Sequence, residues 1–239
     1  MIVLGFDTST PATVVGLRLS QATTLQARDD PDGERRPGHA TRLLPLASGL
    51  LVEAGVGWAE IGRIVVGVGP GTFTGLRIGV ATARGLAQSL GVPLVGVSSL
   101  RALAHAASSG TAEAGVLAVI DARRSEVFAA AYDGDAELVA PFALVPAGIG
   151  ELLERTSAQT EVERWVAVGD GATRYRDALQ LAEVDIPEDH SPLHRIDACA
   201  ICELGADPAL HAPVGAIEVE PDYRRRPDAE IALEEAASR

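Results

Sequence analysis

The chain has 239 residues, of which 47% are hydrophobic and 22% charged, as is ordinary for a soluble globular protein with one large or two small domains. The formal net charge of −13 makes the chain as a whole repel nucleic acid, so another protein would have to hold any RNA substrate. All 20 basic residues are arginine, which excludes a P-loop lysine, a Schiff-base lysine and a lysine general base.

The first residues carry no basic segment, and their apolar run stops at Asp7, so no signal peptide is expected. No stretch approaches the roughly 18 apolar residues of a membrane span. The two cysteines, Cys199 and Cys202, do not make a disulfide scaffold. These features predict a cytoplasmic protein without membrane contact.

In chain order, apolar and β-branched patterns first predict three strands, at 2–7, 13–19 and 23–28. A loop rich in proline, glycine and charge follows at 29–38. The pattern then turns helical from His39, but Pro45 interrupts it, so this helix should kink or start late.

Residues 63–90 form the most distinctive stretch of the chain. Ile64, Val65 and Val66 predict a buried strand, and Gly69-Pro70-Gly71 predicts a turn that leads into a helix. In that helix, small residues recur every fourth position and share one face: Gly75, Gly79, Ala83 and Ala87. This stripe predicts close packing, either against a partner helix or, equally well, against the chain's own sheet.

A strand at 93–97 and a helix at 98–107 complete the first half, and the small, polar segment 108–115 marks a plausible boundary. The second half repeats the order of strands and helices. Its strands are predicted at 116–120, 126–132, 138–144 and 165–168, and its helices at 147–155, 172–181 and 197–204.

Two copies of a strand-rich α/β unit predict an actin/hexokinase/Hsp70-like architecture, with two ribonuclease H-like α/β domains flanking a cleft. The expected domains are 1–108 and a smaller one at 109–215, followed by a C-terminal tail at 216–239. The end of that tail, from Asp228, predicts a charged helix or a disordered end.

Two loops could contact a nucleotide. Asp7, Thr8 and Ser9 follow the first strand, where a carboxylate can orient a magnesium-bound water and hydroxyls can meet phosphate oxygens. Gly71 and Thr72 lie in the glycine turn before the long helix. The simpler alternative is that these residues only satisfy local backbone groups and cap the helix.

A metal site is not expected. The spacing of His190, His194, Cys199 and Cys202 could suggest zinc, but Pro192 separates the histidines and the cysteines lie in an apolar helical run. Buried free thiols are therefore the favoured interpretation. No His-Glu-x-x-His motif supports a zinc protease.

The stretch VGVGPGTFTGLRIGVATARGLAQSLGVPLVGVSSL resembles the signature of the TsaB (YeaZ-like) family. Members of this family are dimerisation partners in the bacterial machinery that makes threonylcarbamoyladenosine beside the tRNA anticodon. The resemblance continues in LGFDTST, HATRLLPLASGLL and DARRSEVFAAAY, and faintly in EPDYRRR.

The resemblance implies an actin-like fold that pairs with the catalytic paralogue, TsaD, which binds metal through two histidines four residues apart. Those positions fall on Ser99 and Leu103 here, and neither is an imidazole ligand. The chain is therefore expected to have no catalysis, no metal and no cofactor of its own, apart from weak ATP or ADP contact at a subunit interface.

In the family, two helices form the surface shared by the homodimer and the heterodimer, and they correspond to 39–54 and 75–90 here. The resemblance thus predicts ten interface residues: His39, Leu43, Leu46, Leu50, Gly75, Ile78, Gly79, Thr82, Ala83 and Leu86.

The expected function is that of a non-catalytic scaffold subunit of the threonylcarbamoyladenosine complex. Its partners would be a TsaD-type transferase and, through the complex, a TsaE-type ATPase, with tRNA contacted only indirectly and a homodimer in isolation. The alternative is an ATP-dependent small-molecule kinase or nucleotidase of the same fold. It would use Asp7 for magnesium and Gly169 to Thr173 as its second phosphate loop.

Overall fold

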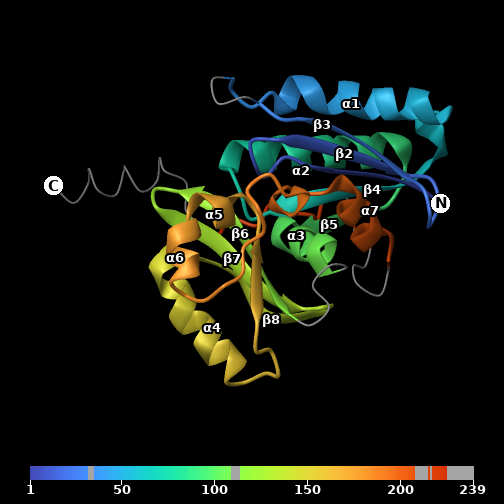
Figure 1. Ribbon diagram of the computed structural model, residues 1–239. Helices are drawn as coiled ribbons and strands as arrows, with labels where there is room; N and C mark the ends of the chain where they lie inside the picture. The colour runs from blue at the N-terminus through green and yellow to red at the C-terminus, as the bar shows by residue number, and fades with distance from the viewer. Residues whose placement is uncertain (32–34, 109–113, 208–214, 216, 225–239) are drawn as a thin grey trace.

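The computed structural model describes residues 1–31, 35–108, 114–207, 215 and 217–224. Its first half contains a five-stranded sheet in the order β3-β2-β1-β4-β5 (Figure 1). The strands are β1 (Ile2–Asp7), β2 (Thr13–Arg18), β3 (Thr24–Asp29), β4 (Ile61–Gly69) and β5 (Leu94–Ser98). β1, β2 and β3 pair antiparallel, whereas β4 runs parallel to both β1 and β5.

Helices cover both faces of this sheet because successive side chains of its strands alternate between the faces. Leu4 and Phe6 of β1 pack with α1 (His39–Ala54) and α2 (Phe73–Leu90) on one face. Val3 packs with α3 (Ser99–Ser108) and α7 (Ala198–Ala206) on the other. In Figure 1, α1 lies above the sheet, with α3 and α7 below it. A short helix, η1 (Trp58–Glu60), precedes β4.

Helix α1 begins at His39 and continues through Pro45, so the expectation of a late start is wrong. Pro45 is on the exposed side of the helix, where water can satisfy the carbonyl that its missing N–H would have bonded. A kink at Pro45 stays a prediction.

The second half has a four-stranded sheet in the order β8-β7-β6-β9. Its strands are β6 (Gly115–Arg123), β7 (Glu126–Asp133), β8 (Ala136–Leu144) and β9 (Trp165–Val168). The outer face is covered by α4 (Ile149–Ser157), α5 (Asp170–Arg174) and α6 (Arg176–Gln180). Two 3₁₀ helices, η2 (Pro146–Gly148) and η3 (Pro192–His194), complete the described elements.

The single helix expected at 172–181 is wrong. Tyr175, with φ −114° and ψ 31°, separates α5 from α6, and α5 begins at Asp170. In both halves, three antiparallel strands are followed by a helix and a strand parallel to the first, which confirms the repeated ribonuclease H-like order.

One hydrophobic cluster joins the two halves. It contains Val65 and Leu100 from the first half, Val116 and Phe128 from the second, and Ile201 of α7. Although it follows the second sheet in the chain, α7 packs on β1 and β2, so closely that a Cβ at Gly16 would lie 2.7 Å from the carbonyl oxygen of Ala198. The domain division at 108 and 215 stays a prediction, and residues 109–113 at its boundary and 225–239 of the tail lie outside the described residues.

Candidate functional site: the outer face of helices α1 and α2

The inner face of α2 is pressed against its own sheet. A Cβ at Gly75 would overlap the carbonyl oxygen of Thr8, and one at Gly79 would overlap the Thr8 hydroxyl. The Thr8 hydroxyl donates a hydrogen bond of 2.7 Å to the Gly75 carbonyl, which fixes the loop after β1 to the first turn of α2. Both glycines are therefore explained by contacts within this chain.

That Gly75, Gly79 and Ala83 admit a partner helix stays a prediction, and the single chain already fills the space beside them. All three residues are buried in the single chain, with Ala83 in the cluster between the sheet and helices α1 and α2. The alternative, packing on the chain's own sheet, accounts for this stripe.

The outer faces of α1 and α2 carry a different set of small residues. Gly49 of α1 and Gly85 of α2 are exposed, and a Cβ added to either would have no heavy atom within 4 Å. A glycine inside a helix costs about 0.8–1 kcal/mol relative to alanine, and at these two positions no contact in the described chain requires it. Close approach of another molecule would explain both.

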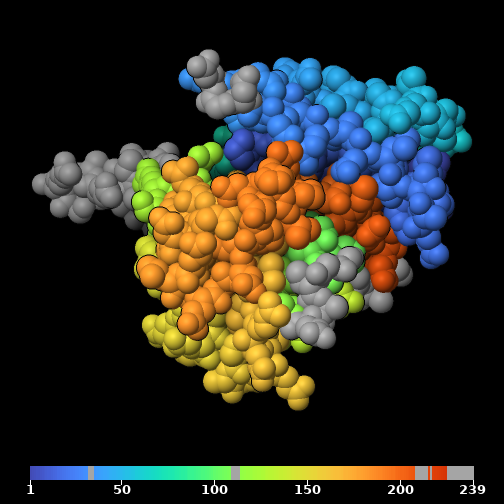
Figure 2. All heavy atoms as spheres, viewed as in Figure 1, coloured from blue at the N-terminus to red at the C-terminus, as the bar shows by residue number. Residues whose placement is uncertain are grey.

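Apolar side chains surround these glycines. On α1, Leu44 is 44% exposed and Val52 is 82% exposed, and on α2 Ala81 is exposed while Ile78, Thr82 and Leu86 are partly exposed. Figure 1 places α1 at the upper edge of the molecule, and the spheres of Figure 2, in the same view, show residues of this part of the chain along that edge. We call Leu44, Gly49, Val52, Ile78, Ala81, Thr82, Gly85 and Leu86 the outer surface.

The remaining predicted interface residues lie beneath this surface. His39, Leu43 and Leu50 are buried, and Leu46 is partly buried against the same cluster. His39, Leu43 and Leu50 hold α1 on the sheet, whereas Leu46 keeps a partly exposed side chain, and the predicted partner contact of all four stays a prediction. Sequence reasoning missed Leu44, Gly49, Val52, Ala81 and Gly85, although Leu44, Ser48 and Val52 define a second helical stripe beside the buried one.

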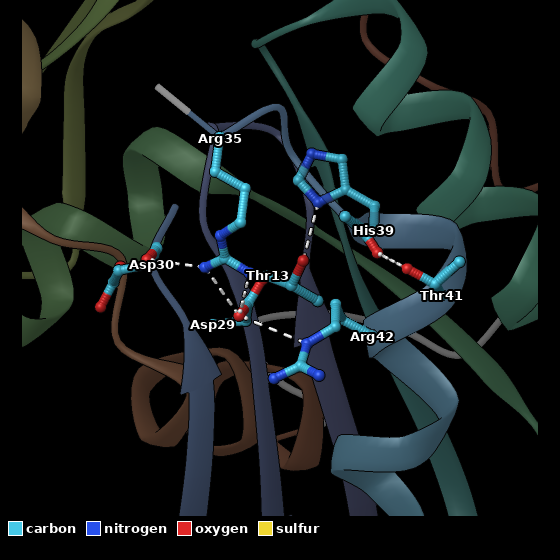
Figure 3. Close-up of polar contacts among 8 residues, drawn as sticks. Thr13, Asp29, Asp30, Arg35, His39, Thr41 and Arg42 are labelled. Carbon is cyan, nitrogen blue, oxygen red and sulfur yellow. Dashed lines mark hydrogen bonds and ion pairs between the residues drawn. The ribbon is translucent and has the colours of Figure 1, made fainter. Parts of the chain in front are cut away.

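Polar contacts anchor the first turn of α1 (Figure 3). The His39 Nδ1 lies 2.8 Å from the Thr13 hydroxyl, and Asp29 at the end of β3 pairs with Arg35 at 3.0 Å and Arg42 at 3.3 Å. Burial lowers the pKa of His39, which favours the neutral imidazole. Because Gly38 offers no side-chain cap, these contacts tie the helix start to β2 and β3.

The loop after β1 is closed. One oxygen of Asp7 accepts the backbone N–H and the hydroxyl of Ser9, both at 2.7 Å, and the other accepts the Ser99 hydroxyl at 2.5 Å. Burial raises the pKa of Asp7 above its ordinary value, while these hydrogen bonds oppose that rise. The Asp7 carboxylate is thus satisfied within the chain.

Because these polar groups bond to one another, the loop after β1 has few free groups for a nucleotide to contact. Asp7, Thr8 and Ser9 are buried, and their predicted contact with a nucleotide stays a prediction. Gly71 and Thr72 are partly exposed, but the Thr72 N–H donates to the Ser9 carbonyl at 2.7 Å, and a Cβ at Gly71 would overlap that same carbonyl. The glycine turn therefore packs directly against the loop after β1.

Ser99 and Leu103, the two positions where the resemblance predicts that metal ligands are missing, are involved in contacts within the chain. Ser99 is buried and bonded to Asp7, and Leu103 lies in the hydrophobic cluster that joins the two halves. Within the described residues, no group of three or more histidine, cysteine or acidic side chains is arranged to hold a metal ion.

A cleft between the halves is lined by residues 10–12, Arg28, Asp30, Asp170 and Arg195, among others. Burial raises the pKa of Asp170 to about 6, and its carboxylate accepts the Asp121 N–H at 3.0 Å. The kinase alternative would place phosphate at residues 169–173, where this buried carboxyl already sits. Arg28, on the opposite wall, is held by both oxygens of Asp30.

The candidate zinc residues do not form a site. His194 is buried, with its ring nitrogens 3.2 Å from the carbonyl oxygens of Gly169 and Pro187. Cys202 is buried beneath Gly5 and Gly16, and burial raises its pKa to about 12. The prediction of a buried core thiol is confirmed for Cys202, whereas Cys199 is only partly buried.

Comparisons with known proteins agree with this architecture. The family model of TsaD, described as tRNA N6-adenosine threonylcarbamoyltransferase, matches residues 34–144. The tRNA threonylcarbamoyladenosine biosynthesis protein TsaB of Escherichia coli K12 is 31% identical, over 94% of this chain and 95% of its own length. The chain belongs to the TsaB family.

Solved structures confirm the fold class of this TsaB-family chain. YeaZ from Pseudomonas aeruginosa matches with a TM-score of 0.70 and 30% identity, covering 92% of this chain and 100% of that one. A ROK hexokinase from Thermus thermophilus matches with a TM-score of 0.55 and 14% identity, covering 87% and 100%, which shows a common fold alone. None of the helices in the described part of the chain is long and apolar enough to cross a membrane.

Proposed function

We propose that this chain is a non-catalytic subunit for threonylcarbamoyladenosine formation in tRNA and that it pairs with a TsaD-type transferase through its outer surface. The observation that carries the proposal is the contrast between the two sites. The loop where a catalytic relative would bind its ligand is closed by the hydrogen bond between Asp7 and Ser99. The outer surface, in contrast, is exposed and consists of apolar and small residues. Surface of this kind is typical of a protein interface.

The remaining partners follow from the same assignment. A TsaE-type ATPase joins through the assembled pair, any ATP or ADP contact is confined to a subunit interface, and the chain forms a homodimer in isolation. The net charge of −13 supports indirect contact with tRNA, because the chain would repel a polyanion. The complex works in the cytoplasm.

The test is a tRNA modification assay with purified subunits and a supply of the threonylcarbamoyl donor. We expect no modified tRNA from this chain alone, little from the TsaD-type subunit alone, and turnover when both are present with the ATPase. Modification by this chain alone, or full activity of the transferase without it, would contradict the proposal.

A further inference from the structure

A segment near the C-terminus, Ile217 to Arg224, lies along α2, and we call it the strap. Helix α1 covers β2 and β3, and α2 covers β4. The strap lies over the ends of β4 and β5, where the Asp222 N–H donates to the Val68 carbonyl at 2.7 Å and Val219 packs over Gly96. Helix α2 is therefore flanked by α1 on one side and the strap on the other.

The strap is held by side chains of α2 itself. Arg84 donates to the carbonyl oxygens of Ile217 at 3.0 Å and Val219 at 2.7 Å. Two turns earlier, the Arg77 Nε donates to the Tyr223 hydroxyl at 3.1 Å. The strap thus runs antiparallel to α2, with Val219 buried as its anchor.

Side chains at both ends of the strap remain open to solvent. Ile217 is 80% exposed and Tyr223 is 43% exposed. The Tyr223 ring lies 5.2 Å from the ring of Phe73, over which Arg77 stacks at 3.9 Å. Tyrosine and arginine are, with tryptophan, enriched at binding hot spots. The terminal nitrogens of Arg77 make no hydrogen bond within the described residues, so they can still bind an acceptor.

We propose that the strap is the third element of the partner surface, beside α1 and α2, and that Tyr223, Arg77 and Ile217 contact the TsaD-type subunit. This inference rests on the proposed function. Phe73 is partly exposed and Arg77 is exposed, on the same helix as Ile78, Ala81, Thr82, Gly85 and Leu86 of the outer surface, so the strap extends that surface along α2. The occupant is the transferase, because the strap lies beside the outer surface that the proposed function assigns to that subunit.

The test compares dissociation constants of the complex with the TsaD-type subunit, measured by analytical ultracentrifugation on the full-length chain. Tyr223→Ala should weaken the complex about tenfold, and Ile217→Ala should weaken it several-fold. Leu181→Ala is the matched control, because Leu181 is 89% exposed on the second half, and it should change the constant less than about twofold. Ile217 is so exposed that its truncation should leave the melting temperature unchanged.

The outcomes separate this inference from the proposed function. If both strap variants bind like wild type while Gly85→Arg abolishes the complex, the strap is only a structural support and the proposed function stands. If Gly85→Arg also binds normally, both proposals fail. If the strap variants weaken only the homodimer, the strap contacts a second copy and the inference is overturned.

Discussion

Small residues occur on both sides of α2, but they pack within the chain on the inner side and are open to solvent on the outer side. On the inner side, Gly75 and Gly79 lie where Thr8 leaves no room for a Cβ. On the outer side, Gly85 faces open space, as Gly49 does on α1. A glycine in a helix therefore indicates that other atoms approach the helix closely, but it does not indicate whether those atoms belong to the same chain or to a partner. Only the surrounding atoms distinguish a residue needed for folding from one available for association.

The largest effect is expected on the inner side. Gly75→Ala places a Cβ against the backbone oxygen of Thr8, which cannot move without disturbing the buried loop after β1. We expect the free energy of unfolding to fall by about 3 kcal/mol, measured by urea denaturation. Stability equal to wild type would show that the loop and α2 are not packed as described.

A smaller effect is expected at the loop. Ser99→Ala removes the hydrogen bond to one oxygen of the buried Asp7 carboxylate, and the free energy of unfolding should fall by about 2 kcal/mol at pH 7. Ser89→Ala, on the exposed side of α2, is the control and should have little effect.

The pH dependence of this loss follows from the pKa of Asp7. Burial raises that pKa in the folded state, and the Ser99 hydrogen bond lowers it, so Ser99→Ala should raise it further. A raised carboxyl pKa stabilises the folded state fully below the unfolded value of 3.8, and this contribution is lost as the pH rises through the folded pKa. The loss should therefore shrink as the pH falls toward 3.8. A loss that is equal at all pH values would show that the Ser99 hydrogen bond does not lower the pKa of Asp7.

The smallest effect has the opposite sign. Gly85→Ala adds a methyl group in open space and removes the flexibility of glycine from the helix, so the monomer should gain about 0.5–1 kcal/mol in thermal or urea unfolding. The same alanine should weaken association, because a partner helix would meet the new Cβ. A destabilised monomer would mean that this side of α2 is covered by its own chain.

Much of the fold could be predicted because its signals are local. The β-branched run at 64–66, the glycine turn and the four-residue spacing in α2 depend on neighbours in sequence, and the observed elements follow them. The placement of α7 on the first sheet could not be predicted this way. It depends on Gly5 and Gly16, which lie nearly two hundred residues earlier in the chain and make room for Cys202.

The spacing of small residues alone could not decide which side of α2 faces outward. The stripe of Gly75, Gly79 and Ala83 competes with a second one, Ala81, Gly85 and Ser89, which has the same spacing. The larger side chains of α2 indicate which side is buried. Leu76 and Val80 share the side of the first stripe, and they are buried, so that side had to face the sheet.

The central claim, that the outer surface binds the transferase, is tested most directly by light scattering of the chain mixed with a TsaD-type subunit. Gly85→Arg is the informative variant, with Gln180→Arg as a control that adds the same side chain at an exposed position of α6. Gly79→Arg would be uninformative because it disrupts the inner packing. We predict that wild type and Gln180→Arg form the heterocomplex, whereas Gly85→Arg remains folded and forms none. A heterocomplex of normal mass and affinity with Gly85→Arg would contradict the account.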